Sequence, residues 1–395
     1  MDSARGATIL LGKPELTKGE RGGKGHAVRH TFDSKSVGRR RTIGVWLLAV
    51  AGMVFGMVVL GGFTRLTESG LSMVDWRPVT GWLPPLSREA WEQAFGAYQQ
   101  FPEYRKVNAG MTLAAFKGIY WLEYLHRLWG RLIGVAFALP LLFFLMKGWI
   151  DRRLAWKLSG MFLLGGLQGV LGWYMVESGL IDRPDVSPYR LVAHLGLALL
   201  IYGYILWVAF GLLAPPRGAA SASPALRRGA IAVAGLVLVT AVAGGFVAGL
   251  DAGFAYNTFP LMDGELVPRQ LLAATPVWRS FFEDVTTVQF THRVLAMLTL
   301  LVVLAFRWSL RSRHLAPTAR RAANLLTGWV FVQFALGVAT LLSTVAVPLA
   351  LAHQASAMIL WTLALRTMFE LRGRECVRRA SPLQSAGRIP NRAVT

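Results

Sequence analysis

Cysteine is almost absent from this sequence, in which Cys376 is the only one. A single thiol excludes an intrachain disulfide and any metal site built from several cysteines. Charged residues are also scarce, at 16% of the chain, whereas a soluble domain carries roughly a quarter. Acidic residues number only 21 against 42 basic ones, which leaves a net charge of +21. This composition excludes an ordinary soluble enzyme.

Apolar residues make up 54% of the chain and are gathered in long blocks. A block of about 20 apolar residues is long enough to cross the hydrocarbon core of a bilayer. The first begins near Ile43, too late and too long for the core of a cleavable signal peptide. We expect eight transmembrane helices, near residues 43–63, 117–146, 155–178, 189–213, 228–250, 285–307, 322–345 and 347–369.

Basic residues gather in alternate loops between these blocks, around Arg39, Lys147, Arg217, Arg307 and Arg372. Loops rich in lysine and arginine stay on the cytoplasmic side of a membrane. We therefore predict a multi-pass protein of the bacterial inner membrane, embedded in the lipid bilayer, with both termini in the cytoplasm. Orientation accounts for the positive charge, so we expect no nucleic-acid partner.

Two halves of the sequence repeat one another, with four matches in the same order. Four spans per half return the chain to its starting side, so the repeat is parallel. The glycine pairs are expected to allow close helix contacts. The matches are Gly61-Gly62-Phe63 with Gly244-Gly245-Phe246, His126-Arg127 with His292-Arg293, Gln168 with Gln333, and Ala193-His194 with Ala352-His353.

The predicted fold is an all-α polytopic membrane protein, with eight transmembrane helices in two pseudo-symmetric four-helix bundles. The outer loops 64–116 and 251–284 are long, and the first is rich in aromatic residues. It forms either a structured cap or a plain interfacial anchor. The expected parts are a disordered basic cytoplasmic tail (1–42), an N-terminal half (43–213), a cytoplasmic linker (214–227), a C-terminal half (228–370) and a cytoplasmic tail (371–395).

Each even-numbered span contains one histidine shortly after it enters from the outer side. The expected helix rise places all four about 10 Å inside the outer face. Histidine at this depth is costly and usually functional, and imidazole is a common axial ligand of haem iron. Zinc is disfavoured, because no carboxylate or cysteine completes a tetrahedral site there. The repeat predicts two haem sites, one formed by His126 with His194 and one by His292 with His353.

Three polar neighbours of these histidines differ in what they indicate. Arg127 and Arg293 each follow a histidine, and they either contact haem propionates or extend to the membrane interface. Glu123 precedes His126 by three residues and shares its helical face, whereas Gln289 takes that position before His292. A carboxylate beside one histidine pair alone indicates that the two halves have different functions.

Together these residues resemble the haem A synthase family, in its mitochondrial and proteobacterial branch. The resemblance covers roughly residues 43–369. Its most specific motifs are the segment from Gly61 to Met73, the segment from Glu123 to Arg127, the segment from Phe254 to Asp263, and the four histidines. Some bacterial members carry a cysteine pair in an outer loop that this chain lacks, so a thiol relay cannot operate here.

The resemblance implies an oxidoreductase that converts the C8 methyl group of haem O to a formyl group, making haem A for a terminal cytochrome oxidase. It implies that His126 and His194 face the substrate haem, and that His292 and His353 hold the iron of a haem b cofactor. Glu123 would be the catalytic residue, as proton acceptor or in substrate positioning. Haem O synthase and oxidase assembly factors are possible partners by pathway logic alone.

Two other functions use the same pattern. A di-haem b-type cytochrome would use the same four histidines only to pass electrons, although transmembrane electron transfer favours haems near opposite faces. A transporter or haem exporter would share the parallel repeat, but it needs charged residues along a midplane path, and these spans contain few.

Overall fold

The computed structural model describes residues 34–76, 80–181, 184–214 and 222–372, and within them the regular structure is helical. Eight helices are long and apolar enough to cross a membrane, which confirms the predicted all-α polytopic fold. They are α1 (Ser34–Leu66), α4 (Leu113–Met146), α5 (Arg152–Leu180), α6 (Pro188–Leu213), α7 (Pro224–Gly249), α9 (Val285–Ser309), α10 (Pro317–Leu342) and α11 (Val347–Leu371).

Several helices begin earlier than the apolar pattern indicates. Helix α1 starts at Ser34, inside the segment expected to be a tail, and most of that segment lies outside the described residues. Helix α7 starts at Pro224, inside the expected linker, where the Ser223 hydroxyl accepts a hydrogen bond from Leu226 N. Polar and basic first turns extend a helix beyond its apolar part, because caps and proline fix the start. The expected tail after residue 372 is not described.

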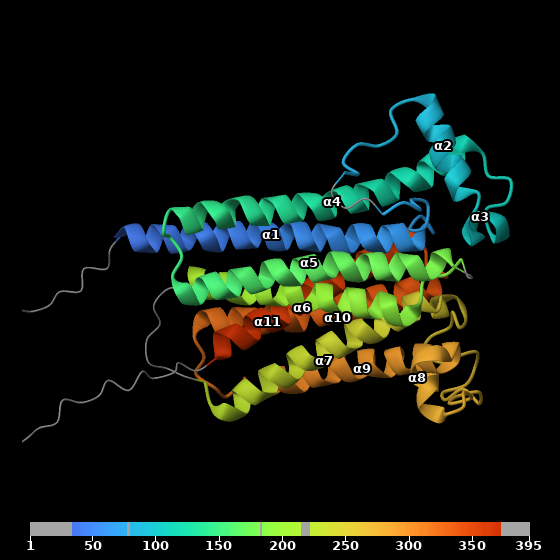
Figure 1. Ribbon diagram of the computed structural model, residues 1–395. Helices are drawn as coiled ribbons and strands as arrows, with labels where there is room; N and C mark the ends of the chain where they lie inside the picture. The colour runs from blue at the N-terminus through green and yellow to red at the C-terminus, as the bar shows by residue number, and fades with distance from the viewer. Residues whose placement is uncertain (1–33, 77–79, 182–183, 215–221, 373–395) are drawn as a thin grey trace, which may run out of the picture.

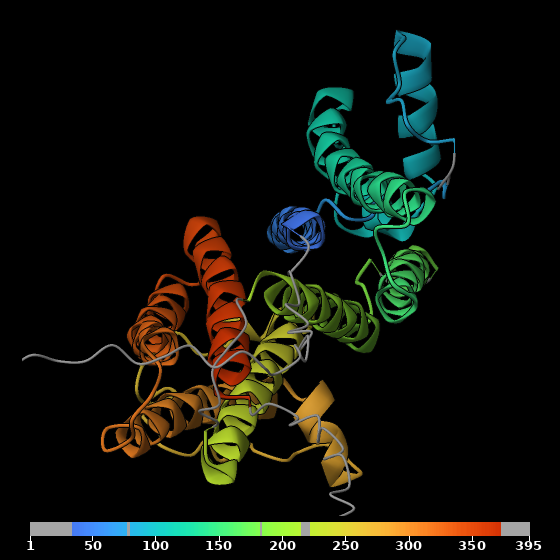
Figure 2. The ribbon, with the colours of Figure 1, turned by 90° about the vertical axis from the view of Figure 1, so that its left-hand side faces the viewer.

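The eight long helices lie side by side and divide into two groups (Figures 1 and 2). In the first half α1 packs on α4 and α6, and α5 completes the ring by packing on the same two helices. In the second half α7 packs on α9 and α11, and α10 completes the ring. The same packing order in both halves supports the two predicted four-helix bundles.

The halves meet through α1 with α11 and through α6 with α7. Glycine permits both contacts: a side chain at Gly62 would overlap Gln354 of α11, and one at Gly245 would press on Val192 of α6. Gln354 donates a 2.8 Å hydrogen bond to the Val58 carbonyl oxygen. The second glycine of each repeated pair thus serves the close helix packing expected from the sequence.

The first outer loop forms an ordered cap on the end of the bundle opposite the start of α1 (Figure 1). It contains α2 (Arg88–Tyr98) and α3 (Pro102–Lys106). Buried aromatic residues join the cap to the outer turns of α4: Trp91, Tyr98, Phe116, Tyr120 and Tyr124. Of the two alternatives, the structured cap is therefore present.

Candidate functional site

Each of the four predicted histidines packs its ring against a glycine of a neighbouring helix. A methyl group on Gly172 would lie 2.9 Å from Cε1 of His194, and one on Gly337 would lie 2.9 Å from Cε1 of His353. The first glycine of each repeated pair has the same function. A methyl group on Gly61 would lie 3.1 Å from Nε2 of His126, and one on Gly244 would lie 3.1 Å from Cε1 of His292.

Two of the histidines have a second repeated neighbour. The Gln168 side-chain nitrogen lies 3.1 Å from Nδ1 of His194, and the Gln333 side-chain nitrogen lies 3.1 Å from Nδ1 of His353. Both amides come from the helix that carries the contacting glycine, one turn or more from it. These glutamines fix the orientation of the rings. The sequence repeat contained them, but their contact with histidine could not be derived from spacing.

His126 on α4 and His194 on α6 lie in the first half, and His292 on α9 and His353 on α11 lie in the second, so each predicted pair belongs to one bundle. His194, His292 and His353 lie six or seven residues after the start of their helices, so they share one depth of about 10 Å. His126 lies 13 residues into α4, because the first turns of α4 belong to the cap.

The surroundings of the rings fit a haem held by two imidazoles. All four histidines are only partly buried by protein. Nδ1 of His292 and Oε1 of both Gln168 and Gln333 are buried without a hydrogen-bond partner in the described chain. Among these described residues no three histidine, cysteine or carboxylate side chains converge as metal ligands, so the imidazole pairs stand alone.

Alanine substitutions at two glycines of α10 test whether the contact between glycine and histidine is needed for haem binding. Gly337→Ala is expected to displace the His353 ring, because the added methyl group would contact Cε1 at 2.9 Å. Gly328→Ala, on the same helix, is the matched control, since a methyl group there meets nothing within 4 Å. We expect haem content of the purified protein to fall several-fold in the first variant and to stay unchanged in the second. Equal haem content in both would show that the glycine contact is incidental.

Glu123 and Arg127 form a buried ion pair that binds the first outer loop to α4. The Glu123 Oε1 atom accepts from Arg127 Nη2 at 2.6 Å, and Oε2 accepts from Ser72 Oγ and Met73 N, both at 2.7 Å. Arg127 also donates to the carbonyl oxygens of Met73 at 2.6 Å and Asp75 at 2.9 Å. Arg127 therefore neither extends freely to the interface nor points away from the protein.

The second half repeats this clamp with an amide in place of the carboxylate. Arg293 donates to the carbonyl oxygens of Tyr256 at 2.8 Å and Thr258 at 2.9 Å. Gln289 donates to the same Tyr256 oxygen at 3.1 Å, a contact that a carboxylate could not make. Each half thus fixes its outer loop from the helix that carries the first histidine, and only the first half does so with a buried negative charge.

A cavity of about 290 Å³ lies beside the first clamp, between the outer loop and the outer end of α5. Arg127, Met73 and Trp76 form one wall, and the Arg127 guanidinium lies 5.5 Å from the centre of the Trp76 ring. The opposite wall comes from Trp173, Val176, Glu177 and Leu180. The helix that carries His126 therefore borders a space lined by aromatic and apolar groups. The sequence did not predict that these α5 residues line a cavity.

The cap also buries a carboxyl group that sequence inspection did not single out. Glu103 in α3 is 4% exposed, and its Oε2 atom has no hydrogen-bond partner among the described residues. Burial raises the pKa of Glu103 to about 8, and the charges of Glu123, Glu68 and Asp185 add to the increase. The nearby Tyr98 hydroxyl opposes it. Glu103 is therefore mostly protonated in the folded protein at neutral pH.

This shift predicts a stability that depends on pH. The raised pKa means that the folded state holds the proton more tightly than the unfolded state, whose pKa is near 4.5. The resulting stabilisation of the folded state is fully present below pH 4.5 and is lost as pH rises through about 8. Between these two pH values we expect the free energy of unfolding to fall by at most about 1.4 kcal/mol per pH unit. Glu103→Gln should remove this pH dependence from thermal midpoints measured in detergent, while Glu89→Gln, at an exposed position of α2, should not. A wild-type slope in Glu103→Gln would contradict the assignment.

Comparison with known proteins agrees with this architecture. The COX15-CtaA family model, described as a cytochrome oxidase assembly protein, matches residues 44–365. Heme A synthase of Nitrosospira multiformis is 52% identical over 336 residues, covering 84% of this chain and 94% of the relative. Heme A synthase of Rhodospirillum centenum is 51% identical over 347 residues, covering 88% and 93%. Heme A synthase COX15 of Bos taurus is 46% identical over 352 residues, covering 87% and 85%.

These similarities confirm the resemblance seen in the sequence motifs, including its mitochondrial and proteobacterial character. They extend over all eight long helices and both histidine pairs, since the matched residues begin in α1 and end in α11. The chain therefore belongs to the COX15-CtaA family of cytochrome oxidase assembly proteins.

Proposed function

We propose that this protein is a haem A synthase, an enzyme that oxidises the C8 methyl group of haem O to the formyl group of haem A. The observation that carries the proposal is the duplicated histidine site with one asymmetric feature. Both halves place two imidazoles against glycines, but only the first adds a buried carboxylate. The haem A synthases to which the chain is similar support the same reaction. A purely electron-transferring di-haem cytochrome gives no reason for this asymmetry.

We assign the substrate to the first half and the cofactor to the second. His126 and His194 would face haem O, whose prenyl tail can lie among the lipid-facing helices beside them. His292 and His353 would hold the iron of haem b through their imidazole nitrogens. Haem b, when bound, supplies one-electron redox chemistry. Arg293 keeps a buried Nε without a hydrogen-bond partner in the described chain, so we retain it as a propionate contact.

Glu123 would act first as a positioning residue. Its carboxylate accepts hydrogen bonds from Arg127, Ser72 and Met73, and these hold the outer loop over the substrate half. Acceptance of a proton from the oxidised methyl group requires one of these donors to leave. The clamp would also keep bulk water from the reacting edge of the substrate, because it closes the loop against α4.

The contacts of the Arg127 guanidinium differ from both alternatives considered from the sequence, which were a haem propionate contact and extension to the membrane interface. The guanidinium is shared between Glu123 and loop carbonyl oxygens, so we assign it to the clamp, and a propionate contact would be additional. The adjacent cavity of about 290 Å³ offers space for part of the substrate without displacing this ion pair. Haem O synthase and oxidase assembly factors remain proposed partners, and the bacterial inner membrane with cytoplasmic termini remains the proposed location.

Complementation tests the proposed activity. The chain would be expressed in a bacterium from which its own haem A synthase has been removed and which still makes haem O. We expect membranes to regain haem A and the absorption band of a haem A-containing oxidase. Glu123→Ala should fail to restore it, whereas Glu92→Ala, an exposed glutamate of the cap, should restore it fully. Absence of haem A with the wild-type chain present in the membrane would contradict the proposal.

A further inference from the structure

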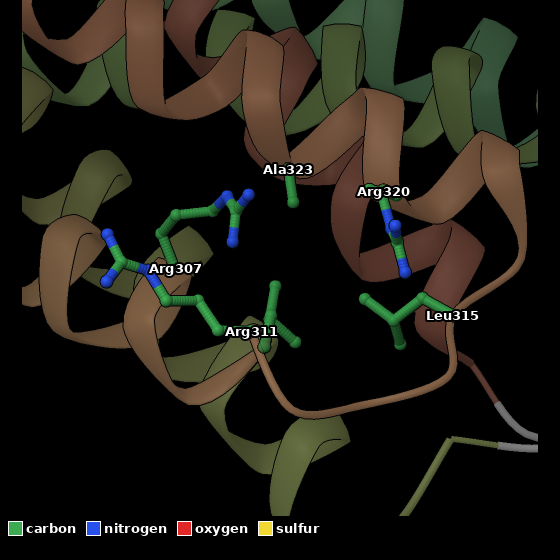
Figure 3. A pocket seen from close by; sticks show the side chains of 6 residues that line it. Arg307, Arg311, Leu315, Arg320 and Ala323 are labelled. Atoms are coloured by element: carbon green, nitrogen blue, oxygen red, sulfur yellow. The ribbon is translucent and has the colours of Figure 1, made fainter.

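The turn between α9 and α10 forms a small pocket at the end of the molecule where α1 begins and α11 ends (Figures 1 and 3). Its volume is about 120 Å³. Three arginines line it, Arg307, Arg311 and Arg320, and in Figure 3 the side chains of Arg307 and Arg320 border the opening while the Arg311 guanidinium points away from it. Leu310, Leu315 and Ala323 supply an apolar lining. The haem sites lie near the opposite end of these helices, so the pocket is separate from them.

The arginines of this pocket have no ion-pair partner among the described residues, and Glu370, which accepts a 2.8 Å hydrogen bond from Thr318 at the start of α10, is paired with Arg366. The segment from Arg307 to Arg321 contains five arginines and no acidic residue. Within the described ranges none of the three lining arginines forms an ion pair with a carboxylate. An arginine cluster of this kind suits an anion with several oxygen atoms, such as a phosphate group.

Two of the guanidinium groups are held in place by neutral neighbours. Arg307 Nε donates a 2.9 Å hydrogen bond to Asn324 Oδ1 of α10. The Arg311 guanidinium lies 4.1 Å from the centre of the Trp308 ring. These contacts orient the groups and leave their charge uncompensated. These side chains therefore lose less conformational entropy when a ligand binds.

The surroundings indicate which phosphate compound fits. The pocket lies at the end of two membrane-spanning helices, where lipid headgroups are found. Exposed apolar side chains lie close to the lining residues in the sequence, since Trp308 on α9 is 68% exposed and Leu325 on α10 is 51% exposed. A phosphate group joined to acyl chains matches a basic pocket beside an apolar surface. Free phosphate would use only the arginines.

The corresponding turn of the first half is built differently. Asp151 lies in the turn between α4 and α5, where its Oδ1 accepts from Leu154 N at 2.8 Å as the cap of α5. Helix α10 begins after Ala316 without a side-chain cap, and no carboxylate is present in its turn. Both turns are basic, as expected for cytoplasmic loops, but only the turn of the second half lacks a carboxylate.

We propose that Arg307, Arg311 and Arg320 form a binding site for the phosphate headgroup of an anionic phospholipid. Cardiolipin and phosphatidylglycerol share this chemistry. The acyl chains would lie against Trp308 and Leu325. This site does not depend on the proposed haem reaction.

Native mass spectrometry of the full chain in an uncharged detergent tests the proposal. Cardiolipin, phosphatidylglycerol, phosphatidylcholine and inorganic phosphate would be added separately to the wild-type protein. We expect adducts of the two anionic lipids at concentrations where phosphatidylcholine and phosphate give none. Equal binding of phosphatidylcholine would overturn the site, and binding of inorganic phosphate at the lipid concentration would assign it to free phosphate.

Two charge-matched variants locate the binding. The pocket variant carries Arg307→Gln, Arg311→Gln and Arg320→Gln, and the control carries Arg152→Gln, Arg153→Gln and Arg313→Gln. We expect anionic lipid affinity to fall at least about tenfold in the pocket variant relative to the control. Equal loss in both would show that lipids respond to overall charge and would overturn the proposal. If the triple variant does not fold, Arg311→Gln against Arg313→Gln gives the same comparison, and an unchanged haem content separates this result from the proposed enzyme function.

Discussion

Alanine at His292 or His353 is expected to lower bound haem b at least tenfold, whereas alanine at His126 or His194 should leave it close to the wild-type level. A haem iron held by two imidazoles loses an axial ligand in either second-half variant. The first-half variants should instead abolish formation of haem A, because they alter the proposed substrate site. Haem extraction followed by chromatography measures both quantities in one sample.

The internal repeat makes this comparison well matched. His194 and His353 have the same surroundings, since each ring contacts a glycine and a glutamine from the preceding long helix. Different outcomes for these two variants would therefore arise from what each half binds and not from packing. Loss of haem b from all four variants alike would contradict the division into a substrate half and a cofactor half.

Glu123→Ala is expected to reduce haem A formation at least 100-fold while haem b content stays unchanged. The substitution removes the acceptor of the contacts from Ser72, Met73 and Arg127. It also leaves the Arg127 side chain, which is 10% exposed, without its carboxylate. Breaking such a buried pair costs about 3–5 kcal/mol, and it removes the anchor of the outer loop on α4.

Glu123→Gln distinguishes positioning of the loop from proton transfer. The amide keeps an oxygen for Met73 N, but its nitrogen cannot accept from Arg127. If positioning dominates, limited proteolysis of the loop preceding Trp76 should increase in step with the loss of haem A. A closed, protease-resistant loop in an inactive variant would instead assign the loss to proton transfer. Gln289→Ala, the matched change in the second half, should leave haem A formation within a few-fold of wild type.

The membrane fold was predictable because it depends on local composition. All eight spans follow from apolar blocks of sufficient length, and the repeated motifs indicate which helices correspond. Helix starts were less predictable. Helices α1 and α10 begin at Ser34 and Pro317, before their apolar parts, because polar turns at the membrane surface can remain helical.

The helix on which each histidine lies was predictable for the same reason, but the residues that contact these side chains were not, and the pairing of the histidines around haem stays a prediction. The spacing of Glu123 and Arg127 permits an ion pair on one helix face, yet the contacts of both with the loop after Ser69 depend on tertiary structure. Glu103 gave no signal in the sequence, because α3 has only five residues and shows no periodic pattern. Its burial arises from the way the cap folds over it.

Haem composition of the purified protein, expressed with and without a haem O synthase, tests the central claim most directly. The account predicts haem b alone without the synthase, and haem b together with haem O and haem A when the synthase is present. It further predicts that His126→Ala removes haem A and retains haem b. Haem b of constant amount, unchanged by co-expression and never accompanied by haem A, would contradict the account and favour an electron-transferring di-haem cytochrome.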